Sequence, residues 1–340
     1  MKSGSLEKDV AQYHVAVVIP AYRVAAHLSQ VIESIPWYVR TIVVVDDGSP
    51  DNLAEILRPV DSSRLVLVAH EQNRGVGAAM MTGFTEALRR GAQICVKIDG
   101  DGQMDPALIA KFCRPIILGE ADYVKGNRFM SGGCAKHMPL VRKFGNLGLS
   151  FMLKMASGYW RIFDPANGYV AVRKETLESL NWDWIAHDYF FESSMLIALH
   201  TSRAVVRDFP LEARYAGEAS SLNPWRVLRQ FPVRLLWCYL RRIWFEYFQY
   251  DFGLASLLML VGVPLLLVGT GLGILYWHRA LVSGTPATGG EVMLSALPVL
   301  ASIQMLIQAL ALDMDSIAGK SQYGPLLQDE NQGPIDVCGA

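Results

Sequence analysis

The chain has 340 residues, 51% of them hydrophobic, and a formal net charge of −1. With a mean hydropathy of +0.23, it is too apolar for an ordinary soluble protein, which favours a globular domain joined to membrane segments. The balanced charge, without a clustered basic stripe, argues against nucleic acid as a partner. Five scattered cysteines contain no Cys-x-x-Cys pair, so neither a zinc site nor a disulfide framework is predicted.

Apolar, β-branched runs alternate with segments of helical spacing over the first hundred residues. The predicted strands are 14–20, 41–45, 64–69 and 93–98, and the predicted helices between them are 25–35, 53–57 and 76–90. Continuous apolar strands separated by helices indicate a parallel sheet covered on both faces, a Rossmann-like α/β layer. In such sheets ligands bind at the carboxyl ends of the strands.

Polar residues gather where three of these strands end. The first strand ends in Pro20-Ala-Tyr22, the second in Asp46-Asp-Gly-Ser49 and the fourth in Asp99-Gly-Asp-Gly-Gln103. The glycines of the last segment let two carboxylates turn toward one hard cation, although acids on a solvated turn are often only part of the turn. Because the three strand ends meet at one edge, the sequence predicts a ligand site there.

The composition changes abruptly after Leu222. Arginines interleave with large aromatic residues over 223–250, a pattern typical of amphipathic helices in a membrane interface. Two runs without charged residues, 252–277 and 292–312, each exceed the roughly 20 residues that cross a bilayer. They predict two transmembrane helices, with buried core helices as the alternative.

Charge asymmetry predicts the orientation of these spans. Five arginines precede the first span and one lies in the connection 278–291, so the positive-inside rule places the N-terminal domain and the C-terminal tail in the cytoplasm. The polar N-terminus lacks the apolar core of a signal peptide, which agrees. We therefore expect a multi-pass protein of the cytoplasmic membrane with a cytoplasmic domain over 1–222, interfacial helices over 223–250, membrane helices within 251–313 and a disordered tail over 314–340.

From about Val15 to the C-terminus, the chain resembles glycosyltransferase family 2, which has a GT-A fold. The segments that carry the resemblance are 18–22, 44–50, 73–77, 99–103, 126–128, 164–168 and 214–222. Within that family it looks most like the dolichyl- or polyprenyl-phosphate hexose synthases, the group of dolichol-phosphate mannose synthase and bactoprenol glucosyltransferase. The residue after Tyr22 departs from the family pattern, since Arg23 stands where an acid or asparagine is frequent.

The resemblance implies roles for individual residues. Those implied to bind the nucleotide sugar are Pro20, Tyr22, Asp47, Asp99, Gly100, Asp101, Gln103 and Arg128. Within this set, Asp101 and Gln103 would ligate Mg²⁺ or Mn²⁺. Those implied to bind an acceptor phosphate are Arg214, Ser220 and Ser221. Asp164 would orient the acceptor or the sugar, with a simple turn as the alternative.

The chemistry of sugar transfer accounts for these residue types. The departing diphosphate gains negative charge, which a divalent ion and an arginine stabilise in the transition state. A phosphate monoester has a second pKa near about 6 and already carries its attacking oxyanion at neutral pH. A sugar hydroxyl would instead need a general base, for which Asp164, Asp188 and Glu192 are candidates, Glu192 being favoured as a structural acid.

The sequence thus predicts the inverting transfer of a hexose from a UDP- or GDP-linked sugar to a polyprenyl phosphate. One alternative is a membrane glycosyltransferase acting on a sugar hydroxyl of a glycolipid or polysaccharide. A second is a non-catalytic membrane scaffold. Neither the nucleotide nor the sugar is predicted, and small residues over 269–273 leave a homo-oligomer possible.

Overall fold

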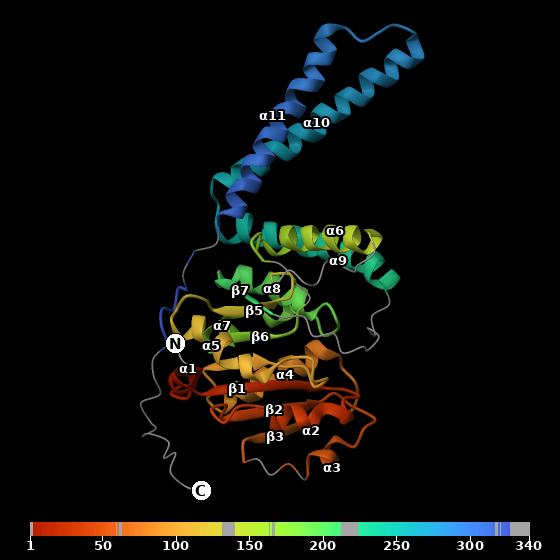
Figure 1. Ribbon diagram of the computed structural model, residues 1–340. Helices are drawn as coiled ribbons and strands as arrows, with labels where there is room; N and C mark the ends of the chain where they lie inside the picture. The colour runs from red at the N-terminus through yellow and green to blue at the C-terminus, as the bar shows by residue number, and fades with distance from the viewer. Residues whose placement is uncertain are drawn as a thin grey trace. The chain divides into compact units, whose positions relative to one another are not determined.

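The structure is a computed structural model that describes residues 3–58, 60, 63–130, 140–162, 164, 167–211, 224–316, 319 and 321–326 (Figure 1). The chain forms two compact units. The first contains Met1–Cys238 together with Ile317–Ala340, and the second contains Tyr239–Ser316. The predicted acceptor residues Arg214, Ser220 and Ser221 lie outside the described residues.

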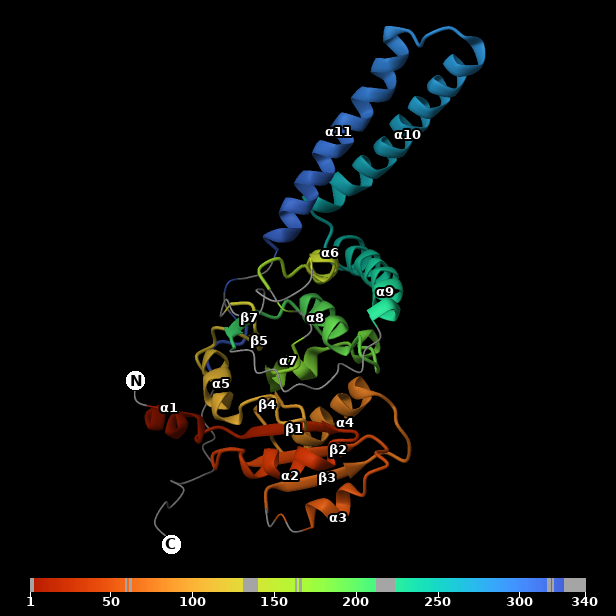
Figure 2. The ribbon, with the colours of Figure 1, turned by 45° about the vertical axis from the view of Figure 1, so that its right-hand side comes forward.

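A seven-stranded sheet in the order β3-β2-β1-β4-β6-β5-β7 forms the centre of the first unit (Figure 2). Its strands are β1 (Val15–Ala21), β2 (Thr41–Asp46), β3 (Leu65–Ala69), β4 (Ile94–Lys97), β5 (Tyr123–Asn127), β6 (Val170–Arg173) and β7 (Val206–Pro210). The first four strands are parallel, as predicted. The sheet as a whole is mixed rather than parallel, because β6 runs antiparallel to both β4 and β5.

The direction of β6 matters for the ligand edge. In the register of β4 and β6, Lys97 lies opposite Val170, so the start of β6 sits beside the carboxyl end of β4. The segment before β6 is therefore brought to the same edge as the loop that follows β4. A parallel strand would have placed that segment at the opposite edge.

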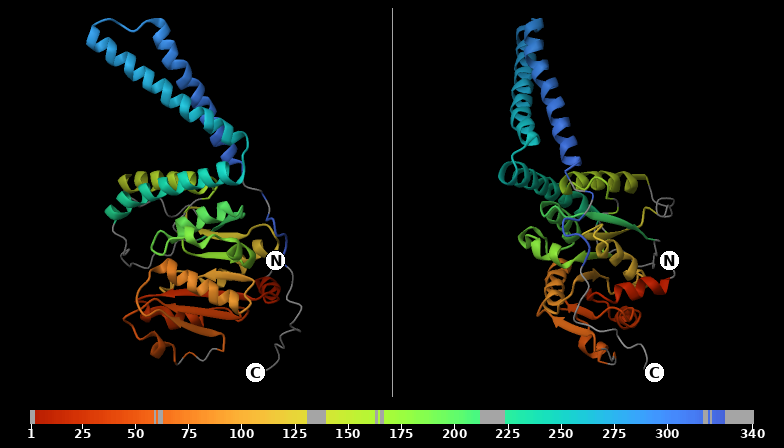
Figure 3. Two further views of the ribbon diagram at one scale, coloured as in Figure 1. Left: turned by 180° about the vertical axis from the view of Figure 1, so that it is seen from behind. Right: turned by 90° about the vertical axis from the view of Figure 1, so that its left-hand side faces the viewer.

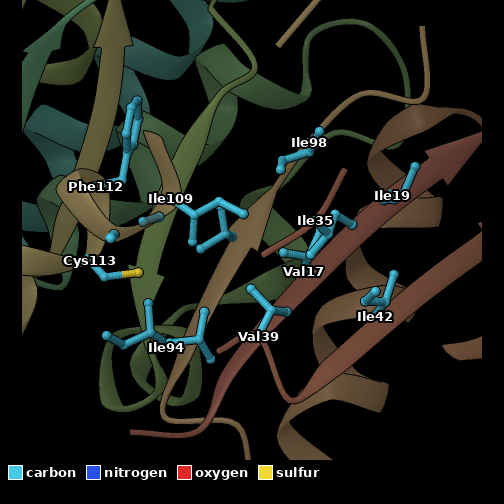
Figure 4. Packing of buried hydrophobic residues seen from close by; sticks show 14 of the residues in the cluster. Val17, Ile19, Ile35, Val39, Ile42, Ile94, Ile98, Ile109, Phe112 and Cys113 are labelled. Carbon is cyan, nitrogen blue, oxygen red and sulfur yellow. The ribbon is translucent and has the colours of Figure 1, made fainter. Parts of the chain in front are cut away.

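Helices cover both faces of the sheet. The helices up to Trp244 are α1 (Ser3–Val10), α2 (Ala25–Glu33), α3 (Leu53–Leu57), α4 (Val76–Arg89), α5 (Ile109–Ile117), α6 (Leu140–Ser157), α7 (Lys174–Ser179), α8 (Phe191–Thr201) and α9 (Pro224–Trp244), with short 3₁₀ turns at Pro106–Leu108 and Trp182–Trp184. On one face Val17 and Ile19 pack with Ile109 and Phe112 in a fully buried apolar cluster (Figure 4). On the other face Gly83 lets α4 lie directly against Val18. Burial of such side chains, worth roughly 1.5–3 kcal/mol each, fixes the strands whose ends form the site.

The second unit is dominated by a helical hairpin, α10 (Leu254–Ser283) and α11 (Gly289–Met314) (Figure 3). Both helices are long and apolar enough to cross a membrane. A Cβ added at Gly269 would lie 2.9 Å from Val299, so this glycine is used for packing inside the hairpin. The homo-oligomer stays a prediction, and the small residues that suggested it are in part occupied within the hairpin.

The predicted interfacial segment contains an ion pair that its sequence pattern did not indicate. Arg242 in α9 is fully buried and binds Asp313 of α11 through two hydrogen bonds, of 2.7 and 2.9 Å, and Glu246 in the π-helical turn Phe245–Tyr250 at 3.0 Å. In an interfacial helix an arginine is expected to face lipid phosphates, but Arg242 is instead enclosed by Asp313 and Glu246. A side chain enclosed by two carboxylates has no surface to offer a headgroup.

The tail returns to the first unit, so the prediction of disorder from residue 314 is wrong for residues 321–326. The Leu326 amide donates to the carbonyl of Ile117 at 3.1 Å, and the side chain of Leu326 is buried in the apolar cluster. The guanidinium of Arg173 binds the carbonyl of Gly324 and lies 5.3 Å from the centre of the Tyr323 ring. Polar composition predicted disorder, but two apolar side chains in a short segment suffice to anchor it.

Candidate functional site

The three predicted strand ends do converge at one edge of the sheet. Strand β1 lies between β2 and β4, with Ala21 opposite Asp46 and Val18 opposite Lys97. A Cβ added at Gly100 would lie 3.1 Å from the side chain of Val24, so the loops after β1 and β4 are in contact. Tyr22 is 41% exposed at this edge, which leaves its ring accessible to a ligand. Pro20 lies on β1 opposite Val45 and is half-buried.

The loop after β4 presents hard oxygen ligands. The carboxylate of Asp101 accepts a hydrogen bond of 3.0 Å from the backbone amide of Gln103. Gly102 between them has a φ of +76°, a left-handed conformation that glycine adopts without strain. The turn thus orients the Asp101 carboxylate, and Asp101 and Gln103 are both half-buried.

Asp47 is committed to the loop that precedes α4. Its carboxylate accepts hydrogen bonds from the backbone amides of Arg74 at 2.9 Å and Gly75 at 2.8 Å, and lies 2.7 Å from the His70 ring. The other ring nitrogen of His70 lies 3.0 Å from the hydroxyl of Thr82. Asp47 is 3% exposed, so its observed contacts shape the 70–75 loop. The histidine that completes this network was not predicted, because nothing in the sequence links it to Asp47.

Arg128 and Asp164 form a two-point ion pair. The guanidinium of Arg128 donates to the two carboxylate oxygens of Asp164 at 2.7 and 2.8 Å, and the Arg128 amide adds a third bond at 3.1 Å. Burial would raise the pKa of the Asp164 carboxyl, but the hydrogen bonds and charge of Arg128 outweigh it and lower that pKa. Arg128 itself is 40% exposed and can reach a ligand, whereas Asp164 is 3% exposed.

Lys125 supports this pair from beneath. Its ammonium group is buried and donates to the backbone carbonyl of Asp164, whose φ of +54° is unusual for a residue other than glycine. Burial lowers the pKa of Lys125 to about 8, against the opposing influence of Asp164 and Asp208. A lysine inside a buried strand gives no sign of this contact in the sequence.

Two of the three candidate bases are held by cations at other positions. Asp188 binds Arg234 of α9 at 2.8 Å, and although burial would raise the pKa of the Asp188 carboxyl, hydrogen bonds led by that of Arg234 outweigh burial and lower the pKa. Glu192 of α8 binds Lys97 at 3.2 Å. This contact is one that a structural acid would make, and the role of Glu192 stays a prediction.

One face of α9 carries large apolar side chains at helical spacing. Val233, Leu236, Trp237, Leu240 and Trp244 are between 49% and 69% exposed and recur every three or four residues. Arg234 of the same helix does not belong to this apolar face, because its guanidinium binds Asp188. Such a face, apolar with two tryptophans, is typical of a helix that lies in a membrane interface.

The oxygen ligands of Asp101 and Gln103 fit a magnesium or manganese ion. Magnesium is commonly held by one or two carboxylates together with substrate phosphates, and carbonyl and carboxylate oxygens suit manganese as well. Within the described ranges, no group of three or more His, Cys, Asp or Glu side chains forms a metal cluster.

Comparison with known proteins supports the family suggested by these segments. The family model for glycosyl transferase family 2 matches residues 16–180. The UDP-N-acetylglucosamine–dolichyl-phosphate N-acetylglucosaminyltransferase of Methanococcus voltae is 33% identical over 232 residues, which are 64% of this chain and 92% of that protein. The dolichol-phosphate mannosyltransferase of Pyrococcus furiosus is 30% identical over 211 residues, covering 60% of this chain and 58% of the other.

A solved structure shares the fold. Glucosyl-3-phosphoglycerate synthase from Mycobacterium tuberculosis, crystallised with Mn²⁺, uridine diphosphate and glucosyl-3-phosphoglycerate, aligns with a TM-score of 0.52 and 22% identity. The alignment covers 71% of this chain and 84% of that one. The family model and the Methanococcus relative both point to one family, and the sheet order and the acidic strand ends agree with it. The chain belongs to glycosyltransferase family 2.

Proposed function

We propose that this protein transfers one hexose from a UDP- or GDP-linked sugar to a membrane polyprenyl phosphate, with inversion at the anomeric carbon. The observation that carries the proposal is the meeting of the Asp99–Gln103 loop and the Asp164 segment at one edge of the sheet. The names of the Methanococcus and Pyrococcus relatives, both of which include a dolichyl or dolichol phosphate, support the acceptor class.

On the donor side, we assign Asp99 to the ribose, Asp101 and Gln103 to a divalent ion, and Arg128 to the donor phosphates. When bound, Mg²⁺ or Mn²⁺ would neutralise the charge that develops on the departing diphosphate. Arg128 is held at two points by Asp164 and still exposes a large part of its side chain, so it can donate to a phosphate without reorganising. Tyr22 and Pro20 would line the nucleotide pocket.

On the acceptor side, the phosphate oxyanion would attack the anomeric carbon from the face opposite the diphosphate. The new bond joins carbon to the phosphate oxygen, the bond to the diphosphate breaks, and the nucleoside diphosphate leaves with its electron pair. The contacts of Asp164, Asp188 and Glu192 support an acceptor that brings its own nucleophile, because each carboxylate is already paired with a cation of the protein. Arg214, Ser220 and Ser221 remain the proposed phosphate ligands.

We further propose that α10 and α11 span the membrane, that α9 lies in its interface, and that the first unit is cytoplasmic. The apolar face of α9 and the arginines before α10 support this orientation. Placing the site near the interface would let a polyprenyl chain remain in the bilayer while its phosphate reaches the first unit.

A donor panel tests the proposal. Detergent-purified protein is incubated with UDP- and GDP-sugars, manganese or magnesium and a short polyprenyl phosphate, and the lipids are read by mass spectrometry and by NMR of the anomeric proton. We expect one lipid-phosphate-hexose mass with an anomeric configuration opposite to that of the donor. A product that retains the donor configuration would contradict the inverting step.

A further inference from the structure

A buried ammonium group lies directly beneath the donor loop. Lys97 is the last residue of β4 and its side chain is 2% exposed, yet its Nζ lies 2.8 Å from Oδ1 of Asp99 and 3.2 Å from Oε1 of Glu192. Burial opposes the charge of this lysine, but the two carboxylates outweigh it and raise the pKa of Lys97. Lys97 is therefore a buried lysine paired with two carboxylates, one in the loop after β4 and one in α8.

The position of this cation is restricted on every side that the structure describes. Lys97 is paired in register with Val18 of β1 and Val170 of β6, so its backbone cannot shift. A Cβ added at Gly168 would overlap the Lys97 ammonium group and come within 3.0 Å of Oδ2 of Asp99. The glycine that closes the 164–168 segment thus makes room for this one interaction.

The contact divides the two oxygens of Asp99. Oδ1 is bound to Lys97, and no second side-chain partner of Asp99 is found in the part of the chain that the structure describes. The Asp99 side chain is 34% exposed, in contrast to the lysine behind it. One oxygen is consequently fixed to the protein and the other is left for a ligand.

We infer that Lys97 is a positioning residue of the donor site, which holds Asp99 in the orientation that binds the nucleotide sugar, with Glu192 as the counter-ion that holds Lys97. This inference rests on the proposed function, since it takes Asp99 to be a donor ligand. Lys97 is too deeply buried to touch the donor itself. It acts through Asp99, and it also offsets the repulsion between that carboxylate and the donor diphosphate.

Nucleotide binding to the full-length protein tests the inference without any acceptor. Titration calorimetry with UDP and with GDP, each with Mn²⁺, is compared for wild type, K97M, the double variant K97M/E192Q and the exposed control K111M. Loss of one charge-assisted hydrogen bond predicts about tenfold weaker binding in both Lys97 variants. Wild type and K111M should bind equally.

The double variant separates positioning from folding. K97M leaves Glu192 without its cation and is expected to lower the melting temperature, whereas K97M/E192Q removes both charges and should recover stability but not affinity. Nucleotide affinity that returns to the wild-type value in K97M/E192Q would overturn the inference and leave Lys97 a purely structural residue.

A cycle with Asp99 checks that Lys97 acts through it. If it does, adding K97M to D99N weakens nucleotide binding little beyond D99N alone, whereas additive losses would contradict the inference. If wild type binds neither UDP nor GDP with metal, the proposed function itself fails and this inference falls with it. Wild-type binding with an unaffected K97M would overturn the inference alone.

Discussion

The guanidinium of Arg128, the residue after β5, donates to both carboxylate oxygens of Asp164, in the segment before β6, at 2.7 and 2.8 Å. One partner is buried and the other is exposed, so the pair presents a cation to the ligand edge while its counter-ion stays inside. This arrangement orients a side chain that would otherwise be free to move.

Replacement of Asp164 by Asn should remove the negative charge that holds the Arg128 guanidinium, while keeping a side chain of similar size. We expect transfer to fall by about 100-fold, the scale on which one preorganised electrostatic contact is lost, with a smaller change in donor KM. Steady-state kinetics with a fixed donor check this. The matched control is Asp183→Asn, an exposed acid in a 3₁₀ turn, for which the rate should not change.

The lowered pKa of Lys125 predicts an alkaline dependence of stability. The folded pKa is about 8 and the unfolded one about 10.4, so between these values the unfolded chain binds the extra proton. Stability should therefore rise as the pH increases from about 8 to about 10.4 and be flat below that range. Thermal unfolding of wild type and K125M across this range checks the sign. A K125M profile as steep as that of wild type would show that another group is responsible.

The returning tail should contribute to the stability of the first unit. Leu326 is 7% exposed in the apolar cluster, so Leu326→Ala removes buried surface and leaves space behind it. Core truncations of this kind cost about 2–5 kcal/mol, and the lower end applies to a peripheral site. The melting temperature should drop for this variant and stay near the wild-type value for Gln322→Ala, whose side chain is exposed. Equal values for both variants would mean that the tail is not bound in solution.

The buried pair Arg242–Asp313 predicts a large effect in the second unit. Removing one partner leaves the other charge buried, which costs about 3–5 kcal/mol, so Asp313→Ala should strongly lower the melting temperature. An apolar pair, R242M/D313L, should recover much of that loss. If the double variant were no more stable than D313A, the loss in D313A would not come from leaving the charge of Arg242 buried without its partner.

Local patterns in the sequence predicted the first four strands and the acidic strand ends, because continuous apolar runs, their length and the turn residues that follow them are local properties. The direction of β6 was not predictable in this way, since a four-residue strand carries no signal of its partner. Contacts between distant residues were missed for the same reason. Lys97 meets Glu192 from 95 positions away, and only the fold brings them together.

Similar limits apply to charged residues near the membrane segments. Arg242 fits the interfacial pattern as well as its neighbour Arg241, and only the position of Asp313 after the second apolar run distinguishes them. The tail showed the converse, since its polar composition concealed two anchoring side chains, Tyr323 and Leu326.

The most direct test of the central claim is to offer the purified protein two matched acceptors, a polyprenyl phosphate and the corresponding polyprenol, with the preferred donor and metal. They share the lipid and differ only in the phosphate that brings the nucleophile. We predict a glycosylated product from the polyprenyl phosphate alone, dependent on the metal and lost in Asp101→Asn. Glycosylation of the polyprenol or of sugar hydroxyls instead, or full activity of Asp101→Asn, would contradict the account.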